Sequence, residues 1–311
     1  MACVLHLRLI SPTARTEEAT AMLTDCTGVT NIVVLPGAAR EPVGDVILCD
    51  AARESANEVL DRLKWLETEG SIAIEQVDLS LSKAAADAVD EAPGEPDDAV
   101  VWEELAHRVR ADSRITWAYL AFLAIATQIA GIGILQNSPI LIVGAMVLGP
   151  EFGAVAAICF GLLHRRWRLV IGSFRTLVVG FAVAIAITFA CALVSNWLDW
   201  IDIGHLVRNE EVQFIVKPDR WSFIVALLAG AAGVLSITAG KSSALVGVFI
   251  SVTTVPAAGY VAVALALADW QEVSGSVSQL AVNILGMVIA GTGTLLVQRK
   301  FWPQVGRRSS V

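Results

Sequence analysis

The sequence predicts a membrane domain of six transmembrane helices, arranged as two inverted three-helix repeats and preceded by a small cytoplasmic α+β domain of ferredoxin-like βαββαβ order. Three observations lead to this fold class. Apolar residues make up 55% of the 311-residue chain, and its mean hydropathy is +0.65, which is too apolar for a typical soluble protein. Residues 1–114 carry 10 basic and 22 acidic residues, a net charge of −12, whereas residues 115–311 carry 12 and 8, a net charge of +4. Sequence features also recur in the two halves of the apolar region.

Charge, cysteine content and the amino-terminal residues exclude several classes of protein. A nucleic-acid binder would present a basic stripe or face, and five scattered cysteines cannot all pair as in a secreted disulfide scaffold. We therefore expect free thiols and no nucleic-acid partner. Residues 1–12 lack the basic segment and long apolar core of a signal peptide, so we expect the chain to start in the cytoplasm.

Residues 1–85 predict the ferredoxin-like domain, because strand and helix periodicities alternate along them. A Pro-Gly turn is expected at Pro36-Gly37, between the second and third strands. The order of elements is the split βαβ pattern, which by itself gives no function. A regulatory ligand-binding module and a passive assembly domain are both open. The expected elements are the strand Val4–Ile10, the helix Thr16–Asp25, the strands Val29–Leu35 and Val46–Cys49, the helix Glu54–Leu66 and the strand Ile72–Leu81.

Residues 86–114 predict an acidic linker followed by a juxtamembrane amphipathic helix. The stretch Lys83–Asp98 is rich in Ala, Asp, Glu, Pro and Gly, which is typical of a solvated linker. Val101–Val109 then favours a short helix along the membrane surface. At the other end of the chain, residues 299–311 predict a basic cytoplasmic tail.

Residues 115–298 contain six apolar stretches long enough to cross a bilayer, which takes about 20 residues. With a cytoplasmic amino-terminal domain, eleven Lys and Arg residues flank the inner ends and three flank the outer ends. This asymmetry satisfies the positive-inside rule and places both termini in the cytoplasm. The expected spans are 115–135, 138–163, 169–198, 221–239, 242–268 and 276–297.

An internal repeat relates the first three spans to the last three. Trp117 pairs with Trp221 at an offset of 104 residues, and Pro150 pairs with Pro256 at an offset of 106. The third helices match at an offset of 103. Because each repeat has an odd number of spans, the second copy must enter the membrane from the opposite side, and inverted repeats are typical of transporters.

The second helix of each repeat is interrupted near its middle. The first interruption is Gly149-Pro150-Glu151, and the second is Thr253-Thr254-Val255-Pro256. Proline removes a backbone donor and clashes with the preceding turn, and in lipid the freed carbonyls need partners. Corresponding breaks therefore predict a cavity or site near the midplane; simple packing kinks are the alternative.

Glu151 is the most informative single residue. A carboxylate near the bilayer centre costs about 2.5–3.5 kcal/mol on insertion scales, which predicts a proton- or cation-coupled group that faces water. The alternatives are a protonated carboxyl that bonds to a neighbour, or a position nearer the membrane surface. Arg175 lies about two turns inside its span, where it can snorkel to the headgroups or pair with Glu151.

Further polar residues suggest a polar interior, although each one alone is compatible with interhelical hydrogen bonding. We expect no catalytic, cofactor or metal site, because no zinc, nucleophile or phosphate-loop pattern occurs at usable spacing. The protein is therefore not expected to be an enzyme. The candidate transport or ion site comprises Glu151, Pro150, Gly149, Thr253, Thr254, Pro256, Asn137, Lys241, Asn283 and Arg175.

The run Asn137–Met146, followed by Gly149-Pro150, resembles the bacterial and archaeal membrane family called domain of unknown function 389. Residues 245–248, the pair Val255-Pro256 and the helix with Asn283 extend the resemblance to about residues 115–297. It implies a multi-span protein of the cell membrane, often with a soluble domain, and implies no substrate. Family members usually have an apolar residue after the first proline and often a double proline in the second repeat. This chain differs by Glu151 and a single Pro256.

Three functions are compatible with the sequence. The first is a secondary transporter of an unknown small solute or ion, with a midplane site between the two broken helices. The second is an oligomeric channel gated by the cytoplasmic domain. The third is a membrane sensor or scaffold that transports nothing. We expect membrane lipid as a partner. Glycines in the spans permit close helix contact and would suit a homo-oligomeric assembly, for example Gly144, Gly149, Gly153, Gly230, Gly233, Gly247 and Gly259.

Overall fold

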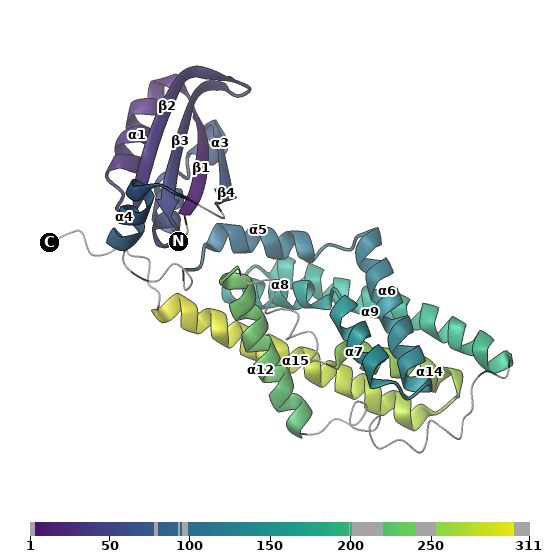
Figure 1. Cartoon of the computed structure of the whole chain (residues 1–311). Coiled ribbons are helices and arrows are strands. Elements are labelled where there is room, and N and C mark those ends of the chain that lie inside the picture. Colours follow the sequence, from purple (N-terminus) through teal and green to yellow (C-terminus); the bar gives the residue numbers. More distant parts are fainter. Residues whose placement is uncertain are drawn as a thin grey trace. The chain divides into compact units, whose positions relative to one another are not determined.

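The computed structural model describes residues 4–77, 80–92, 94, 99–198, 200, 220–240 and 253–301. The described residues form two compact units (Figure 1). The first extends to Leu105 and also takes in Lys300 and Phe301, and the second runs from Ala106 to Arg299. Each unit is described by itself.

The first unit contains a four-stranded antiparallel sheet with the strand order β2-β3-β1-β4. Its strands and helices follow one another in the order that the sequence predicts, except that the second predicted helix is divided into two. The elements are β1 (Val4–Ser11), α1 (Thr16–Thr24), β2 (Val29–Arg40), β3 (Val43–Ala52), α2 (Ala56–Arg62), α3 (Leu66–Glu69) and β4 (Ser71–Gln76).

The turn between β2 and β3 is not where the sequence places it. Pro36 and Gly37 lie inside β2, and the chain turns at Glu41-Pro42 instead. The pairing of β2 with β3 is irregular between Leu35 and Ala39, so a bulge accommodates the two residues. Because β2 is an edge strand, Pro36 can sit there without removing a ladder hydrogen bond. The prediction of a turn at Pro36-Gly37 is therefore wrong.

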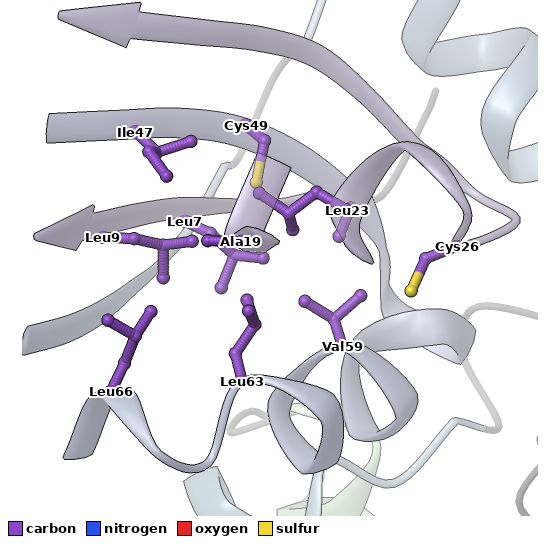
Figure 2. Close-up of a cluster of buried hydrophobic side chains, with 11 residues drawn as sticks. Leu7, Leu9, Ala19, Leu23, Cys26, Ile47, Cys49, Val59, Leu63 and Leu66 are labelled. Atoms are coloured by element: carbon purple, nitrogen blue, oxygen red, sulfur yellow. The ribbon is translucent and has the colours of Figure 1, made fainter. Parts of the chain in front are cut away.

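The core of the first unit lies between the sheet and its helices (Figure 2). Alternate side chains of β1 and β3 point to this face, as the two-residue period of a strand requires. Burial raises the pKa of the Cys49 thiol to about 12, so this cysteine is neutral at pH 7. The main apolar contributors are Leu7, Leu9, Ile47 and Cys49 from the strands, and Leu23, Val59, Leu63 and Leu66 from the helical side.

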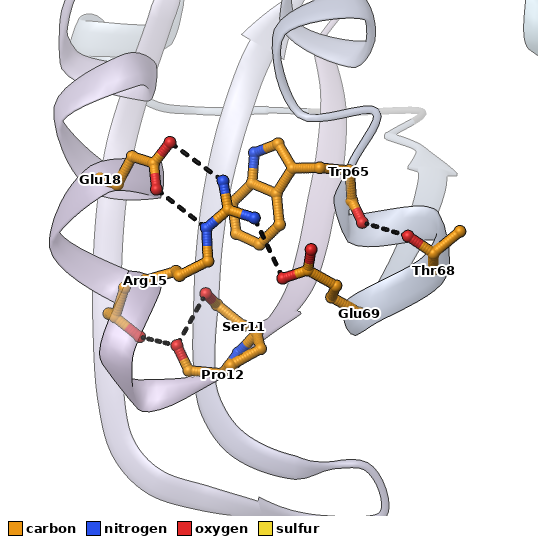
Figure 3. Close-up of polar contacts among 8 residues, drawn as sticks. Ser11, Pro12, Arg15, Glu18, Trp65, Thr68 and Glu69 are labelled. Atoms are coloured by element: carbon orange, nitrogen blue, oxygen red, sulfur yellow. Dashed lines mark hydrogen bonds and ion pairs between the residues drawn. The ribbon is translucent and has the colours of Figure 1, made fainter.

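Arg15 connects the start of α1 to α3 (Figure 3). Its Nε and Nη2 atoms donate to Glu18 at 2.9 and 3.0 Å, and its Nη1 atom donates to Glu69 at 3.0 Å. The guanidinium carbon lies 3.6 Å from the ring centroid of Trp65, which adds a cation–π contact. The hydrogen bonds from Arg15 lower the pKa of Glu18.

Asp45 accepts hydrogen bonds from Gly37 N at 2.8 Å, Thr16 Oγ1 at 2.7 Å and Thr13 Oγ1 at 3.2 Å. These bonds, the Gly37 bond first, lower the pKa of the Asp45 carboxyl. A carboxyl with a lowered pKa in the folded state stabilises it above the unfolded pKa of about 3.9, and this contribution is lost as pH falls through the folded value.

We predict that Asp45→Asn destabilises the first unit most at pH 7, and that the difference from wild type shrinks as pH falls below about 4. The full-length protein is unfolded in urea at pH 2.5–7. Unfolding of the first unit is detected by proteolytic cleavage within residues 4–77. Asp87→Asn is the matched control, because Asp87 is exposed on α4 (Lys83–Glu91). A pH-independent difference for Asp45→Asn would contradict the prediction.

Part of the stretch expected to be a solvated linker forms the helix α4. The Ser82 side chain accepts a hydrogen bond from Ala85 N at 3.2 Å and so caps the helix. Ala85 and Ala88 are buried, and α4 packs on β2 and β3. The small apolar face of α4 explains why an acidic, alanine-rich segment is ordered here.

Helix α5 (Trp102–Asp112) overlaps most of the helix predicted over Val101–Val109. Before it, Asn57 Nδ2 donates to Val100 O at 2.7 Å, and Trp102 N donates to Asn57 Oδ1 at 3.1 Å. This single asparagine therefore holds both sides of the turn into α5.

The second unit is helical, and four of its described helices are long and apolar enough to cross a membrane. These are α6, α9, α12 and α15, and the pair α7 and α8 is bent by 50° and counts at most as a fifth span. The predicted fifth span covers α14, which has 13 residues, and residues 242–252, which lie outside the described part of the chain. The bounds are α6 (Trp117–Leu135), α7 (Pro139–Leu148), α8 (Glu151–Leu163), α9 (Trp167–Trp197), α12 (Arg220–Thr238), α14 (Thr254–Ala266) and α15 (Trp270–Phe301).

The two short helices α8 and α14 are buried almost all round. Residues 154–161 of α8 and residues 254–264 of α14 are all buried. The long helices instead expose large apolar side chains, for example Phe174 on α9 and Ile289 on α15. Exposed apolar faces of this kind suit contact with lipid, so the short helices form the interior of the unit.

Small residues allow each short helix to approach helices far away in the sequence. An added Cβ at Gly259 of α14 would lie 3.0 Å from Ala130 Cβ in α6. An added Cβ at Gly233 of α12 would overlap the ring of Phe152 in α8, and one at Gly291 of α15 would lie 2.9 Å from Cys159 Sγ in α8. Helix α14 thus packs against α6 and α9, and α8 packs against α9, α12 and α15.

Candidate functional site

Glu151 lies where the two buried short helices begin. It is the first residue of α8, it follows Gly149 and Pro150 at the bend after α7, and only 6% of it is exposed. Its Oε1 atom accepts a hydrogen bond of 2.6 Å from Thr254 Oγ1. Thr254 is the first residue of α14 and is fully buried. One hydrogen bond therefore joins the amino-terminal ends of α8 and α14.

The Glu151 carboxyl lies at two partial positive charges and pairs with no basic side chain of the described residues. Each helix amino-terminus carries about half a positive charge, so both helices favour an anion at this point. No basic side chain in the described part of the chain forms an ion pair with Glu151, and its Oε2 atom has no hydrogen-bond partner there. The carboxyl is thus held at one oxygen and unbonded at the other.

Gly149 provides the space that the carboxyl occupies. An added Cβ at Gly149 would overlap Glu151 Oε2 and would lie 2.7 Å from Val255 Cγ2. The bend between α7 and α8 therefore packs directly on the first turn of α14. A side chain at residue 149 would displace either the carboxyl or α14.

An amide cluster continues from Thr253 onto α15. Asn283 Nδ2 donates to Thr253 Oγ1 at 2.9 Å, and Gln279 Nε2 lies 3.5 Å from Asn283 Oδ1. Gln279 and Asn283 are both buried, and Gln279 Oε1 has no hydrogen-bond partner among the described residues. Because Thr253 and Thr254 are adjacent, a polar connection runs from Glu151 through α14 to α15.

The two prolines lie at helix starts. Pro150 is the residue before α8, and Pro256 is the third residue of α14. The first four N–H groups of a helix have no partner within it, so neither proline removes a hydrogen bond from these helices. What precedes Thr253 lies outside the described residues.

Three predicted site residues are not gathered here. Asn137 is exposed at the turn after α6, with a positive φ of 50°. Arg175 is exposed on α9 and makes no ion pair with Glu151, both residues being described. Lys241 lies outside the described residues. The structure therefore brings together Glu151, Gly149, Pro150, Thr253, Thr254, Pro256 and Asn283.

Sequence reasoning missed two groups beside the site. The buried Tyr119 hydroxyl on α6 has no hydrogen-bond partner in the described part of the chain, and it lies within electrostatic range of Glu151. Near Gly153, two residues beyond Glu151, lies the exposed Asp112 at the end of α5; an added Cβ at Gly153 would be 2.7 Å from Asp112 Cβ. A tyrosine near a span end looks like an ordinary interfacial aromatic, so no sequence signal marked it.

The site has one carboxyl, several hydroxyls and two amides. Among the described residues, no group of three His, Cys, Asp or Glu side chains could hold a metal ion. The groups that the site offers are therefore one carboxyl and several neutral oxygens.

Comparison with known proteins gives a family. The model of the family described as Domain of unknown function (DUF389) matches residues 146–289, which contain Glu151, both threonines and both amides. An uncharacterised protein of Methanocaldococcus jannaschii is 24% identical over 200 residues, covering 61% of this chain and 58% of that protein. No solved structure matches the chain. The family match and the archaeal relative therefore support the resemblance of residues 146–289 to the domain of unknown function 389 family.

Proposed function

We propose that the protein is a membrane transporter in which Glu151 couples the movement of a small solute or ion to a proton or a cation. One observation carries the proposal: the Glu151–Thr254 hydrogen bond joins the starts of two short helices that are buried inside a set of long apolar helices. Transporters commonly build their sites from the ends of discontinuous helices. An ionisable side chain buried inside an apolar helical unit is by default a candidate functional group.

The sequence repeat supports this proposal. Its offsets place α6 on α12, the pair α7 and α8 on the segment that ends in α14, and α9 on α15. Three spans in each copy require an inverted arrangement, in which α8 and α14 are the second halves of two interrupted spans and begin beside Pro150 and Pro256. The packing of α14 on α6 and α9, and of α8 on α12 and α15, agrees with two interlocked copies.

The setting follows from the same proposal. The apolar helices suggest a membrane protein, and we place it in the bacterial or archaeal cell membrane with both termini in the cytoplasm, as a homo-oligomer. The strand order β2-β3-β1-β4 is the one expected of a ferredoxin-like domain. In this proposal the domain either binds a regulatory ligand or makes subunit contacts.

Flux in proteoliposomes tests the function. Glu151→Gln keeps the shape of the side chain and removes its charge, so we expect proton- or cation-driven flux to fall at least tenfold or to lose its dependence on pH. Wild-type protein and the variant are compared in sealed vesicles, under an imposed proton gradient and under an imposed Na⁺ gradient.

The matched control is Glu272→Gln, the same substitution in the first turn of α15, which should leave flux unchanged. Folding of each variant is checked by its elution from a size-exclusion column. Folded wild-type protein that passes neither protons nor cations would refute the transporter proposal and favour a sensor or scaffold. Flux that survives in Glu151→Gln would remove Glu151 from the path.

A further inference from the structure

The unbonded atoms at the site can all act as acceptors: two are a carboxyl and an amide oxygen, and the third, the Tyr119 hydroxyl, can also donate. Glu151 Oε2 and Gln279 Oε1 have no hydrogen-bond partner among the described residues, and both side chains are more than nine-tenths buried. Buried acceptors need a donor or a cation. A ligand that bears acceptors, such as a carboxylate or a phosphate, would leave them unsatisfied.

The single carboxyl group of the site favours a monovalent cation over a divalent one. Glu151 is its one carboxylate, and two helix starts already reduce the negative potential there. Divalent calcium sites collect several carboxylates, and no cluster of three such ligands occurs among the described residues. A monovalent cation adds less positive charge to this single carboxyl than a divalent cation would.

Hydrogen-bond geometry favours a cation over a proton at the free oxygen, Oε2. A proton on Glu151 Oε2 would be a buried donor without an acceptor, since that oxygen has no partner in the described part of the chain. Oε1 is already occupied by the Thr254 hydroxyl. A cation, in contrast, is coordinated only by oxygen atoms that can accept. The carboxylate, the threonine hydroxyls and the amide oxygens can all do so.

We propose that the meeting point of α8 and α14 is a binding site for a small alkali-metal cation, with the Glu151 carboxylate as its charged ligand and the Thr254 hydroxyl beside it. The proposal rests on the proposed function and names its coupling ion. Along α15, Gln279 Oε1 is a further oxygen without a partner among the described residues, and Asn283 links Gln279 to Thr253 by hydrogen bonds.

Binding is measured without transport, on full-length protein in detergent. The probe is Na⁺, titrated as NaCl against choline chloride at constant ionic strength and constant pH, with LiCl and KCl in parallel. We expect the thermal midpoint to rise with at least one of these cations and to saturate, because a ligand that binds only the folded state stabilises it. Binding of ²²Na⁺ to the folded protein gives a second readout.

Glu151→Gln and Thr254→Val should each weaken the apparent affinity at least tenfold, whereas Glu272→Gln should not change it. If the Glu151 variant fails to fold, Thr254→Val still tests the site, because it keeps the side-chain shape. The proposal is overturned if none of the three cations raises the thermal midpoint more than choline does. It is also overturned if the midpoint saturates at the same cation concentration in both site variants as in wild type. Cation binding without flux in vesicles would support the cation site and refute transport. Flux without cation binding would support transport and refute the cation site.

Discussion

Replacement of Gly230 by alanine is expected to destabilise the membrane unit by about 3 kcal/mol or more. An added Cβ at Gly230 of α12 would lie 2.6 Å from Met287 Cα in α15 and would overlap the Met287 carbonyl oxygen. The obstacle is backbone, which cannot rotate away as a side chain can. Overpacking of this kind usually costs about 1–3 kcal/mol. Because the added methyl group would force two long helices apart, we expect a cost at the upper end of this range.

The measurement is the thermal midpoint of full-length protein in one detergent. Gly293→Ala on α15 is the matched control, since nothing lies within 4 Å of an added Cβ there. Alanine is favoured over glycine in a helix by about 1 kcal/mol, so the control should be neutral or slightly more stable. Equal midpoints for the two variants would contradict the close contact of α12 with α15.

The second large effect is expected from Leu7→Ala in the amino-terminal unit. Leu7 is fully buried on β1, opposite Cys49 of β3 and Ile74 of β4. Replacing a buried leucine by alanine costs about 2–5 kcal/mol, because apolar contacts are lost and a cavity remains. Leu7 lies on a central strand, so the surrounding sheet has little freedom to collapse into that cavity.

Hydrogen exchange of the full-length protein, resolved by peptide, measures this loss. Amides of β1, β3 and β4 that open with the whole unit should exchange about 30-fold to 4,000-fold faster, which corresponds to about 2–5 kcal/mol. Leu81→Ala is the same substitution at a side chain that is 91% exposed, and it should leave the exchange unchanged. Similar exchange in both variants would mean that Leu7 does not support the sheet.

Local patterns predicted the elements whose signal lies within one stretch of chain. Long apolar runs identified α6, α9, α12 and α15, and two-residue alternation identified β1 and β4. A charge in an apolar run singled out Glu151. The turn at Pro36-Gly37 failed because an edge strand with a bulge can hold both residues. The linker prediction missed α4, because its order depends on packing against β2 and β3.

The sequence by itself determined that this is an apolar, membrane-type protein with an amino-terminal α+β domain and a carboxyl group in its second apolar stretch. Only the tertiary structure decided what that carboxylate meets. Thr254 lies 103 residues from Glu151, and Asn283 and Gln279 lie further along the chain. Composition and periodicity report the preferences of neighbouring residues, whereas a hydrogen bond between two helix starts depends on how distant helices pack, and no local pattern records that.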